Sequence, residues 1–209
     1  TLELSEPEVV SEVLYYTGLN TGSYTLSVSM DGDSWRDVAI LEQKHSMLFS
    51  WRVPETGEFA ARYVRLTADN RLFLGSFVLR DADGNPIALT AQDSSAEALL
   101  DESDVTPESP NYRNSTYFDE IYHARTAYEN VTNVYPYEIS HPPLGKLILS
   151  VGIRLFGMTP FGWRCMGTLT GVLMLPVLYL LLKRMFGSTE ISACCTVIFA
   201  FDFMHFVQT

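Results

Sequence analysis

The most constraining feature of the sequence is an uninterrupted apolar run in its second half. Residues 165–182 carry no charged side chain, and the run is bounded by Arg164 and by the pair Lys183 and Arg184. A helix of about 20 apolar residues spans the hydrocarbon core of a bilayer. Pro176 lies inside the run, which membrane helices tolerate. The run therefore predicts a transmembrane helix.

A second apolar run, residues 191–207, follows after a short loop and is interrupted by Asp202 and His205. Together the two runs predict a helical hairpin in a multi-pass protein of the cell membrane. The loop between them is basic, and the positive-inside rule places such loops in the cytoplasm. Arg164 and the whole chain before it are then expected on the extracytoplasmic side.

A shorter apolar stretch, residues 144–158, precedes the first span and contains Lys146 and Arg154. Its length and charges favour a helix that lies in the membrane interface or packs against the bundle. The alternative, a third span, would reverse the topology of the hairpin, and the basic loop argues against that.

Charge divides the chain into two halves. Residues 1–110 contain 19 acidic and 7 basic side chains, a balance of 7 − 19 = −12, whereas residues 111–209 contain 6 acidic and 7 basic ones, a balance of +1. An acidic surface excludes nucleic acid as a partner, because phosphate binding needs a basic face. The three cysteines all lie in the apolar half and form neither a disulfide framework nor a zinc pattern.

The first half alternates between apolar and polar residues over short segments separated by turn residues. This period-two pattern predicts an antiparallel β-sandwich. The expected strands lie within residues 12–89, at 24–30, 35–40, 47–53, 60–66, 72–80 and 87–89.

Three segments of this half resemble discoidin-type modules, which are galactose-binding-like jelly rolls. They are Ser-Met-Asp-Gly-Asp-Ser-Trp at 29–35, Ala-Arg-Tyr-Val-Arg-Leu at 61–66 and the Asp-Gly turn at 83–84. The resemblance covers residues 10–90, and the family's first strands are missing from it. It implies either carbohydrate binding or a spacer role. We interpret Trp35 and Trp51 as core residues, and Asp31 with Asp33 as a hairpin turn rather than a calcium site.

The sequence predicts four segments. They are a sandwich at 1–90, a solvated acidic linker at 91–112, an external loop with an interfacial helix at 113–160, and two transmembrane helices at 161–209. The chain begins with Thr1 rather than Met, without a basic leader, and stops inside an apolar run. We therefore expect it to be a piece of a longer protein.

Ionisable residues gather just before the apolar region. Asp119, Glu120 and His123 lie in a stretch, 117–129, that is predicted to be helical, with Asp119 and His123 on one face. A carboxylate at a membrane surface can act as a general base when partial burial and a nearby cation adjust its pKa. Arg164 would hold a phosphate bidentately. This pattern suggests transfer from a membrane-borne phosphate-linked donor, although by pattern alone an ordinary charged helix start explains the carboxylates more simply.

Two motifs and an arginine resemble the protein O-mannosyltransferase family of GT-C glycosyltransferases. The motifs are Phe-Asp-Glu at 118–120 and His-Pro-Pro-Leu-Gly-Lys at 141–146, and Arg164 opens a membrane helix after them. Residues 201–209 also resemble the family's bacterial members, so that the likeness covers 113–209. It implies a partial GT-C fold, a polyprenyl- or dolichyl-phosphate sugar donor, usually mannose, and a Ser/Thr hydroxyl acceptor.

Carried over by position, the resemblance makes Asp119 the catalytic base and Glu120 a support for the acceptor or the base. Arg164 would bind the donor phosphate. The donor or substrate side of the pocket would include His123, His141 and Lys146. For His141 and Lys146 a structural alternative stays open, namely a rigid turn and a lysine that reaches the lipid headgroups.

The chain departs from the family in two respects. A sandwich and a linker stand where the family has a membrane helix, so we interpret the sandwich as inserted in the first external loop. Two helices are also too few for a complete donor pocket, so the piece alone is expected to be inactive. One Asp-Glu pair and a histidine are not a coordination set, and the sequence predicts no metal site while leaving a divalent cation open.

Two rival functions remain at this point. One is a non-catalytic, membrane-anchored surface protein whose sandwich binds carbohydrate. The other is a transferase of the same fold that acts on a glycolipid or polymer instead of a protein.

Overall fold

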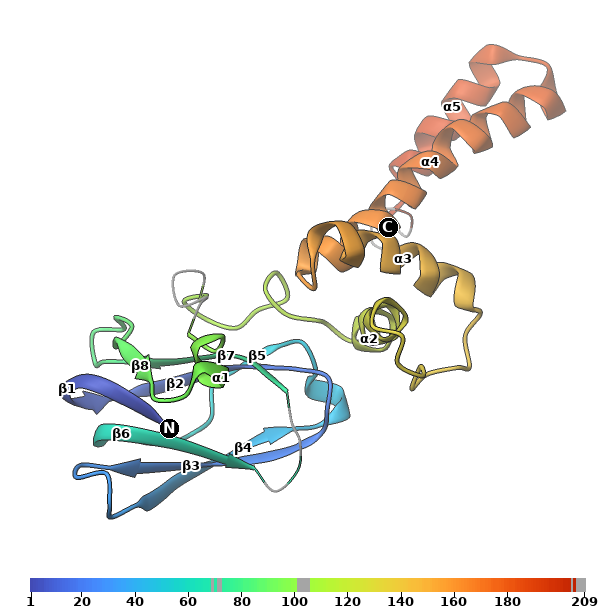
Figure 1. Cartoon of the computed structure of the whole chain (residues 1–209). Coiled ribbons are helices and arrows are strands. Elements are labelled where there is room, and N and C mark those ends of the chain that lie inside the picture. The colour runs from blue at the N-terminus through green and yellow to red at the C-terminus, as the bar shows by residue number, and fades with distance from the viewer. Residues whose placement is uncertain (69, 71–72, 101–105, 204, 206–209) are drawn as a thin grey trace. The chain divides into compact units, whose positions relative to one another are not determined.

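The computed structural model describes residues 1–68, 70, 73–100, 106–203 and 205. The chain forms two compact units, Thr1–Ile121 and Tyr122–Thr209, and each is described by itself (Figure 1). The four segments expected from the sequence, 1–90, 91–112, 113–160 and 161–209, stay predictions.

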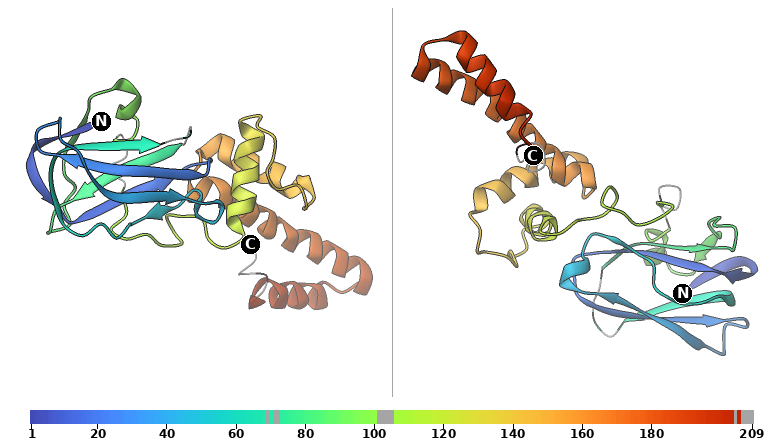
Figure 2. Two further views of the ribbon diagram at one scale, coloured as in Figure 1. Left: turned by 90° about the horizontal axis from the view of Figure 1, so that it is seen from below. Right: turned by 180° about the vertical axis from the view of Figure 1, so that it is seen from behind.

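The first unit contains two antiparallel sheets (Figure 2). The larger sheet has the strand order β4-β3-β6-β1-β8, and the smaller one has the order β5-β2-β7. The strands are β1 (Leu2–Val10), β2 (Glu12–Thr17), β3 (Gly22–Ser29), β4 (Arg36–Gln43), β5 (Trp51–Arg52), β6 (Phe59–Ala68), β7 (Leu74–Arg80) and β8 (Leu89–Ala91).

The two sheets share one hydrophobic core. Alternate residues of each strand face inward, such as Leu26 and Val28 of β3, and they meet Val13 of β2 and Phe77 and Leu79 of β7. Stacked sheets bury one face each in this way. The alternation in the sequence therefore correctly predicted a sandwich-like, β-rich first unit.

Three strands differ from the sequence-based prediction. β1 and β2 were not among the expected strands, the first of which was 24–30. β1 lies between β6 and β8, and its pairing with β6 is interrupted between Glu3 and Glu8, where the alternation is lost. The strand expected at 47–53 is reduced to β5. A 3₁₀ helix, His45–Met47, and the left-handed backbone of Phe49 (φ 53°) replace its first half.

The chain after β8 stays in contact with the sheets. Helix α1 (Ser94–Glu97) is followed by Leu99, whose carbonyl accepts the N–H of Phe77 at 3.1 Å. Further on, Thr116 donates its hydroxyl to the carbonyl of Leu48 at 2.7 Å. Part of the segment expected to be a solvated linker, 91–112, thus packs on the sandwich, while its residues 101–105 lie outside the described part of the chain.

The second unit is helical, and its elements run from yellow to red in Figure 1. They are α2 (Glu120–Val131), α3 (Pro143–Phe156), α4 (Pro160–Phe186) and α5 (Thr189–Ala200). Thr159 caps α4 by accepting the N–H of Gly162 at 3.1 Å, and Gly187 ends the helix in the left-handed conformation.

The helices α2, α3 and α4 meet in a small core of Ala124, Ala127, Ile153 and Trp163. The close approach of α3 and α4 depends on glycine, because a Cβ on Gly152 would lie 2.3 Å from the carbonyl oxygen of Gly162. Small residues allow membrane-associated helices to pack at such short range.

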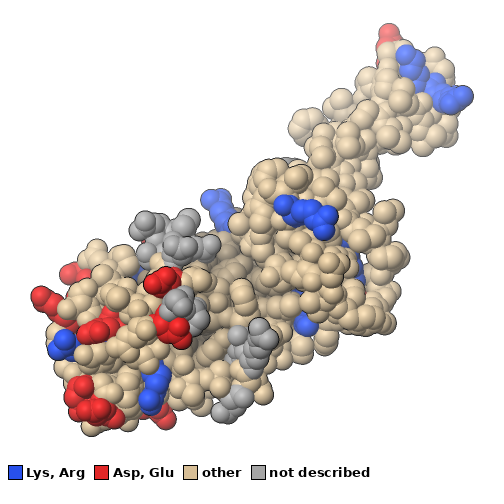
Figure 3. Space-filling view, viewed as in Figure 1, with Lys and Arg blue, Asp and Glu red and all other residues tan. Residues whose placement is uncertain are grey.

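Among the described residues, α4 is the one helix long and apolar enough to cross a membrane by length and composition. α5 is apolar but has 12 residues. The second span expected at 191–207 extends to residues 204, 206 and 207, which lie outside the described part of the chain. The visible face in Figure 3 agrees with the charge division: acidic side chains gather over the β-rich unit, and the helical unit is largely uncharged.

Candidate functional site

A cavity of about 340 Å³ in the helical unit collects three of the residues singled out from the sequence. They are His123 on α2, His141 in the loop before α3 and Lys146 on α3, and the two imidazole centroids lie 5.6 Å apart. The remaining lining is mostly apolar or small: Pro142, Gly145, Ile148, Leu149, Gly167, Thr170, Gly171 and Met174. The cavity thus has a basic part and an apolar part.

Lys146 is buried, with 3% of its surface exposed. Its ammonium group donates to the main-chain carbonyl of Glu138 at 2.9 Å and forms an ion pair with the Glu138 carboxylate. Burial lowers the pKa of Lys146, and the negative charge of Glu129 partly offsets this by raising it. This buried pair is difficult to reconcile with a lysine that reaches out to lipid headgroups.

A second buried carboxylate, Glu129, anchors the loop between α2 and α3. It accepts from Nε of Arg125 at 2.8 Å and from the backbone N–H of Tyr137 at 2.9 Å. The Arg125 guanidinium also lies 4.1 Å from the centre of the Tyr137 ring. Glu129 and Glu138 were both missed in the sequence, where the four-residue spacing of Arg125 and Glu129 was the available signal.

The Asp119 and Glu120 pair lies at the start of α2. The helix expected over 117–129 begins at Glu120, after a turn in which Phe118 has a left-handed backbone (φ 48°). Asp119 is the residue directly before the helix, and the common face expected for Asp119 and His123 stays a prediction. Asp119 is exposed in the turn before the helix.

Glu120 has a local structural task. Its Oε2 accepts the N–H of Tyr117 at 3.0 Å, and its own N–H donates to the Tyr117 carbonyl at 3.0 Å. These two hydrogen bonds close the turn that leads into α2. Glu120 of the Asp-Glu pair thus stabilises the turn from which α2 begins.

Arg164 is the fifth residue of α4, half-buried, with its guanidinium 5.8 Å from the centre of the Trp163 ring. It is not among the described residues that line the cavity. Gly167 and Gly171, which do line it, follow three and seven residues later on the same helical face. The structure thus aligns Arg164 with the α4 part of the lining without bringing it to the cavity.

Within the described residues, no group of three or more His, Cys, Asp or Glu side chains is arranged to hold a metal ion. Asp202 and His205 lie beyond α5, where the N–H of His205 donates to the Asp202 carboxylate at 3.2 Å. The motif expected at 201–209 includes residues 204 and 206–209, which lie outside the described residues.

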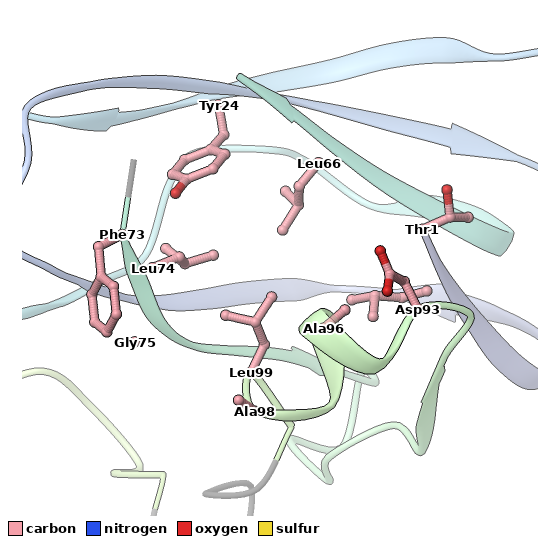
Figure 4. A pocket seen from close by; sticks show the side chains of 11 residues that line it. Thr1, Tyr24, Leu66, Phe73, Leu74, Gly75, Asp93, Ala96, Ala98 and Leu99 are labelled. Carbon is pink, nitrogen blue, oxygen red and sulfur yellow. The ribbon is translucent and has the colours of Figure 1, made fainter. Parts of the chain in front are cut away.

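The β-rich unit has a cavity of its own, of about 440 Å³, between the two sheets and α1 (Figure 4). Tyr24 enters from β3 and faces Leu66 and Leu74, while Leu99 lies on the opposite side. Burial raises the pKa of Tyr24 to about 12, so its phenol is neutral at physiological pH.

The two tryptophans interpreted as core residues differ in exposure. Trp51 is buried as predicted. Trp35 is half-exposed, and the Arg65 guanidinium lies 4.1 Å from the centre of the Trp35 ring.

Comparison with known proteins supports the family resemblance of the second half. Residues 140–209 match the family described as dolichyl-phosphate-mannose-protein mannosyltransferase. The chain is 33% identical over 97 residues to a polyprenol-phosphate-mannose–protein mannosyltransferase of Mycobacterium tuberculosis. The aligned region covers 43% of this chain and 18% of the relative. The chain is 28% identical over 107 residues to the protein of the same name from Mycolicibacterium smegmatis, covering 48% and 21%.

The chain thus spans about a fifth of the length of these curated relatives. A third relative, from Corynebacterium glutamicum, bears the same name and is 37% identical over 54 residues, which is 26% of this chain and 10% of the relative. No solved structure matches the chain.

Proposed function

We propose that this chain is part of a membrane glycosyltransferase that moves mannose from a polyprenyl- or dolichyl-phosphate donor to a Ser or Thr hydroxyl of a protein. The observation that carries the proposal is the overlap of the family match with the cavity. The match at 140–209 includes His141, Lys146 and every lining residue of α3 and α4. Its relatives are named for this transfer.

The cavity supports the donor assignment through its chemistry. A polyprenyl-phosphate sugar has an anionic phosphate joined to an apolar chain. Cationic donors bind phosphate oxygens through short charge-assisted hydrogen bonds. Lys146 offers such a donor at the basic part of the lining, and the His141 imidazole lies beside it. Ile148, Leu149 and Met174 offer an apolar surface for the first isoprene units. Arg164 is the further cation that we assign to the leaving phosphate.

The transfer forms a bond between the acceptor oxygen and the anomeric carbon of mannose. The bond from that carbon to the phosphate oxygen breaks, and the lipid phosphate leaves with the bonding electrons. We assign Asp119 as the base that takes the hydroxyl proton. Glu120 keeps a supporting role, in line with its hydrogen bond to Tyr117 at the start of α2.

The remaining parts of the proposal concern the setting of this reaction. We propose that the parent protein is multi-pass and that the Asp119 loop and the β-rich unit are extracytoplasmic, because Lys183 and Arg184 follow the apolar part of α4. We also propose that residues 1–90 are a discoidin-like module inserted in the first external loop. Helix α4 is long and apolar enough to cross a membrane, which supports membrane association.

The test is a transfer assay on the full-length protein that contains this chain, with polyprenyl-phosphate mannose and an acceptor peptide. Asp119→Asn keeps the side-chain volume and removes the basic group. We expect the turnover rate to fall at least about 10²-fold, because positioned general bases contribute that much or more.

The matched control is Asp33→Asn, which removes an exposed carboxylate from the β3–β4 turn. A turnover rate of Asp119→Asn within about threefold of that of Asp33→Asn would contradict the assignment of Asp119 as the general base. In the same assay, an unchanged donor KM in the Arg164→Ala variant would contradict the assignment of Arg164 to the phosphate site.

A further inference from the structure

Glu138 contacts two of the three basic side chains that we assign to the donor phosphate, Lys146 and His141. It lies in the loop between α2 and α3, and 14% of its side chain is exposed. Its carboxylate forms the ion pair with Lys146, and its Oε2 lies 3.2 Å from Nδ1 of His141. No feature of the sequence motif had pointed to this residue.

The position of the Lys146 ammonium is set by Glu138. Within the described residues both of its hydrogen-bond acceptors belong to Glu138, one on the side chain and one on the main chain. A buried ammonium without such partners would be very unfavourable. An ammonium has three N–H donors, so two bonds to Glu138 fix its place and leave one donor for an external anion.

The orientation of His141 depends on the same carboxylate. Nδ1 of His141 lies 3.2 Å from Oε2 of Glu138 and forms a hydrogen bond of 3.2 Å with Oγ of Ser140, so this edge of the ring faces Glu138 and its neighbour. Nε2 lies on the opposite edge of the ring. The backbone N–H of Ser140 also donates to Oε1 of Glu138 at 2.6 Å, which fixes the residue just before the histidine. One carboxylate therefore organises the turn, the imidazole and the ammonium.

Glu138 is itself held in place by the neighbouring carboxylate. Glu129 binds the N–H of Tyr137, the residue directly before Glu138, at 2.9 Å. Glu129 is 2% exposed and is paired with Arg125 on its own helix. The loop is thus anchored to α2 at the point where it presents Glu138 to α3.

We propose that Glu138 is a positioning residue for the donor phosphate, acting through Lys146 and His141. A carboxylate repels a phosphate, so a direct bond between the two is unfavourable. Its effect comes from holding the Lys146 ammonium and the His141 imidazole where the phosphate can meet both. The proposal rests on the proposed function, because it takes the cavity as the donor site.

The experiment measures the KM for polyprenyl-phosphate mannose and kcat in the full-length protein. Glu138→Gln keeps the size of the side chain and removes its charge, and Glu190→Gln on the exposed first turn of α5 is the matched control. We expect Glu138→Gln to raise the donor KM roughly tenfold, as loss of a supporting partner does at ligand sites, with kcat within about threefold.

A double variant separates positioning from general stabilisation. If Glu138 acts through Lys146, Glu138→Gln combined with Lys146→Met has the same donor KM as Lys146→Met alone, within about twofold. Glu138→Asp, which keeps the charge, is expected to restore most of the donor KM. A lowered melting temperature with equal losses in kcat and donor affinity would mean a structural role and overturn the proposal.

The outcomes also separate this inference from the proposed function. A donor KM in Glu138→Gln equal to that of Glu190→Gln, while Lys146→Met raises it, overturns the role of Glu138 and leaves the donor cavity intact. If the donor KM is unchanged in both Glu138→Gln and Lys146→Met, the role of Glu138 and the assignment of the cavity to the donor are both overturned.

Discussion

At the scale of single residues, carboxylates organise this chain by accepting backbone N–H groups. Glu129 holds the α2–α3 loop through Tyr137, Glu120 holds the start of α2, and Asp31 holds the β3–β4 turn. A carboxylate offers several lone pairs to neighbouring donors, and such bonds favour its charged form. For Asp31 the pKa is lowered accordingly, so the stability of the β3–β4 turn depends on the ionisation of this carboxyl group.

Asp31 gives a pH prediction. Its carboxylate accepts the N–H groups of Ser34 at 2.8 Å and Asp33 at 2.9 Å and the hydroxyl of Ser29 at 2.8 Å, and these bonds hold its pKa well below the ordinary value of 3.8. The stabilisation is present above pH 3.8 and is lost as the pH falls through the lower folded pKa. We expect Asp31→Ala to lower the Tm of residues 1–121 at neutral pH. The Tm of the variant should also fall less steeply than that of the unchanged protein as the pH is lowered, which thermal unfolding across a pH series measures.

The control for this prediction is Asp33→Ala, which removes an exposed carboxylate from the same turn and keeps the hydrogen bonds to Asp31. Equal Tm values of the two variants across the pH range would show that the Asp31 bonds do not stabilise the fold.

At the scale of elements, the crossing of α3 and α4 determines the shape of the cavity. A Cβ on Gly152 would lie 2.3 Å from the Gly162 carbonyl oxygen and 2.9 Å from Sγ of Cys165. We expect Gly152→Ala to destabilise the full-length protein by about 1–3 kcal/mol, because two backbones must separate. Thermal unfolding in detergent measures this change.

Gly145→Ala is the matched control on the same helix, since nothing lies within 4 Å of a Cβ there. It should be neutral or slightly stabilising, because alanine is the better helix former. Equal unfolding temperatures for the two variants would mean that α3 and α4 are not packed this closely.

At the scale of the whole molecule, the chain is built from two units of different character. The first unit has its own core, and five hydrogen bonds hold residues 107–116 against it. The Arg80 guanidinium donates to the carbonyls of Pro107 and Glu108, and the N–H of Trp51 donates to the Ser115 hydroxyl. The hydroxyl and the N–H of Thr116 donate to the carbonyls of Leu48 and Phe49. We expect residues 1–121 to fold alone and unfold cooperatively, as measured by circular dichroism.

Truncation of this unit after residue 100 removes all five bonds. At about 0.5–1.5 kcal/mol each, their loss should lower Tm by at least about 10 °C. An equal Tm for residues 1–100 and 1–121 would show that the segment is only loosely associated, as the solvated-linker prediction had it.

The sequence by itself determined the features that depend on local pattern. Period-two alternation identified β3, β6 and β7, because one face of each strand must be buried. The uncharged run at 165–182 identified α4, because length and apolarity suffice for that prediction. The family resemblance of the motifs implied that His123, His141 and Lys146 lie on the substrate side of one pocket, and the three residues line one cavity.

Only the tertiary structure decided which charges meet. Glu138 lies eight residues before Lys146, with a loop and a helix start between them, so no periodicity relates the two side chains. The left-handed turn at Phe118, which takes Asp119 out of the helix, is likewise a backbone conformation that an aromatic residue does not signal. Ion pairs across loops depend on the path of the chain in space, and that path is set by packing in the core of Ala124, Ala127, Ile153 and Trp163.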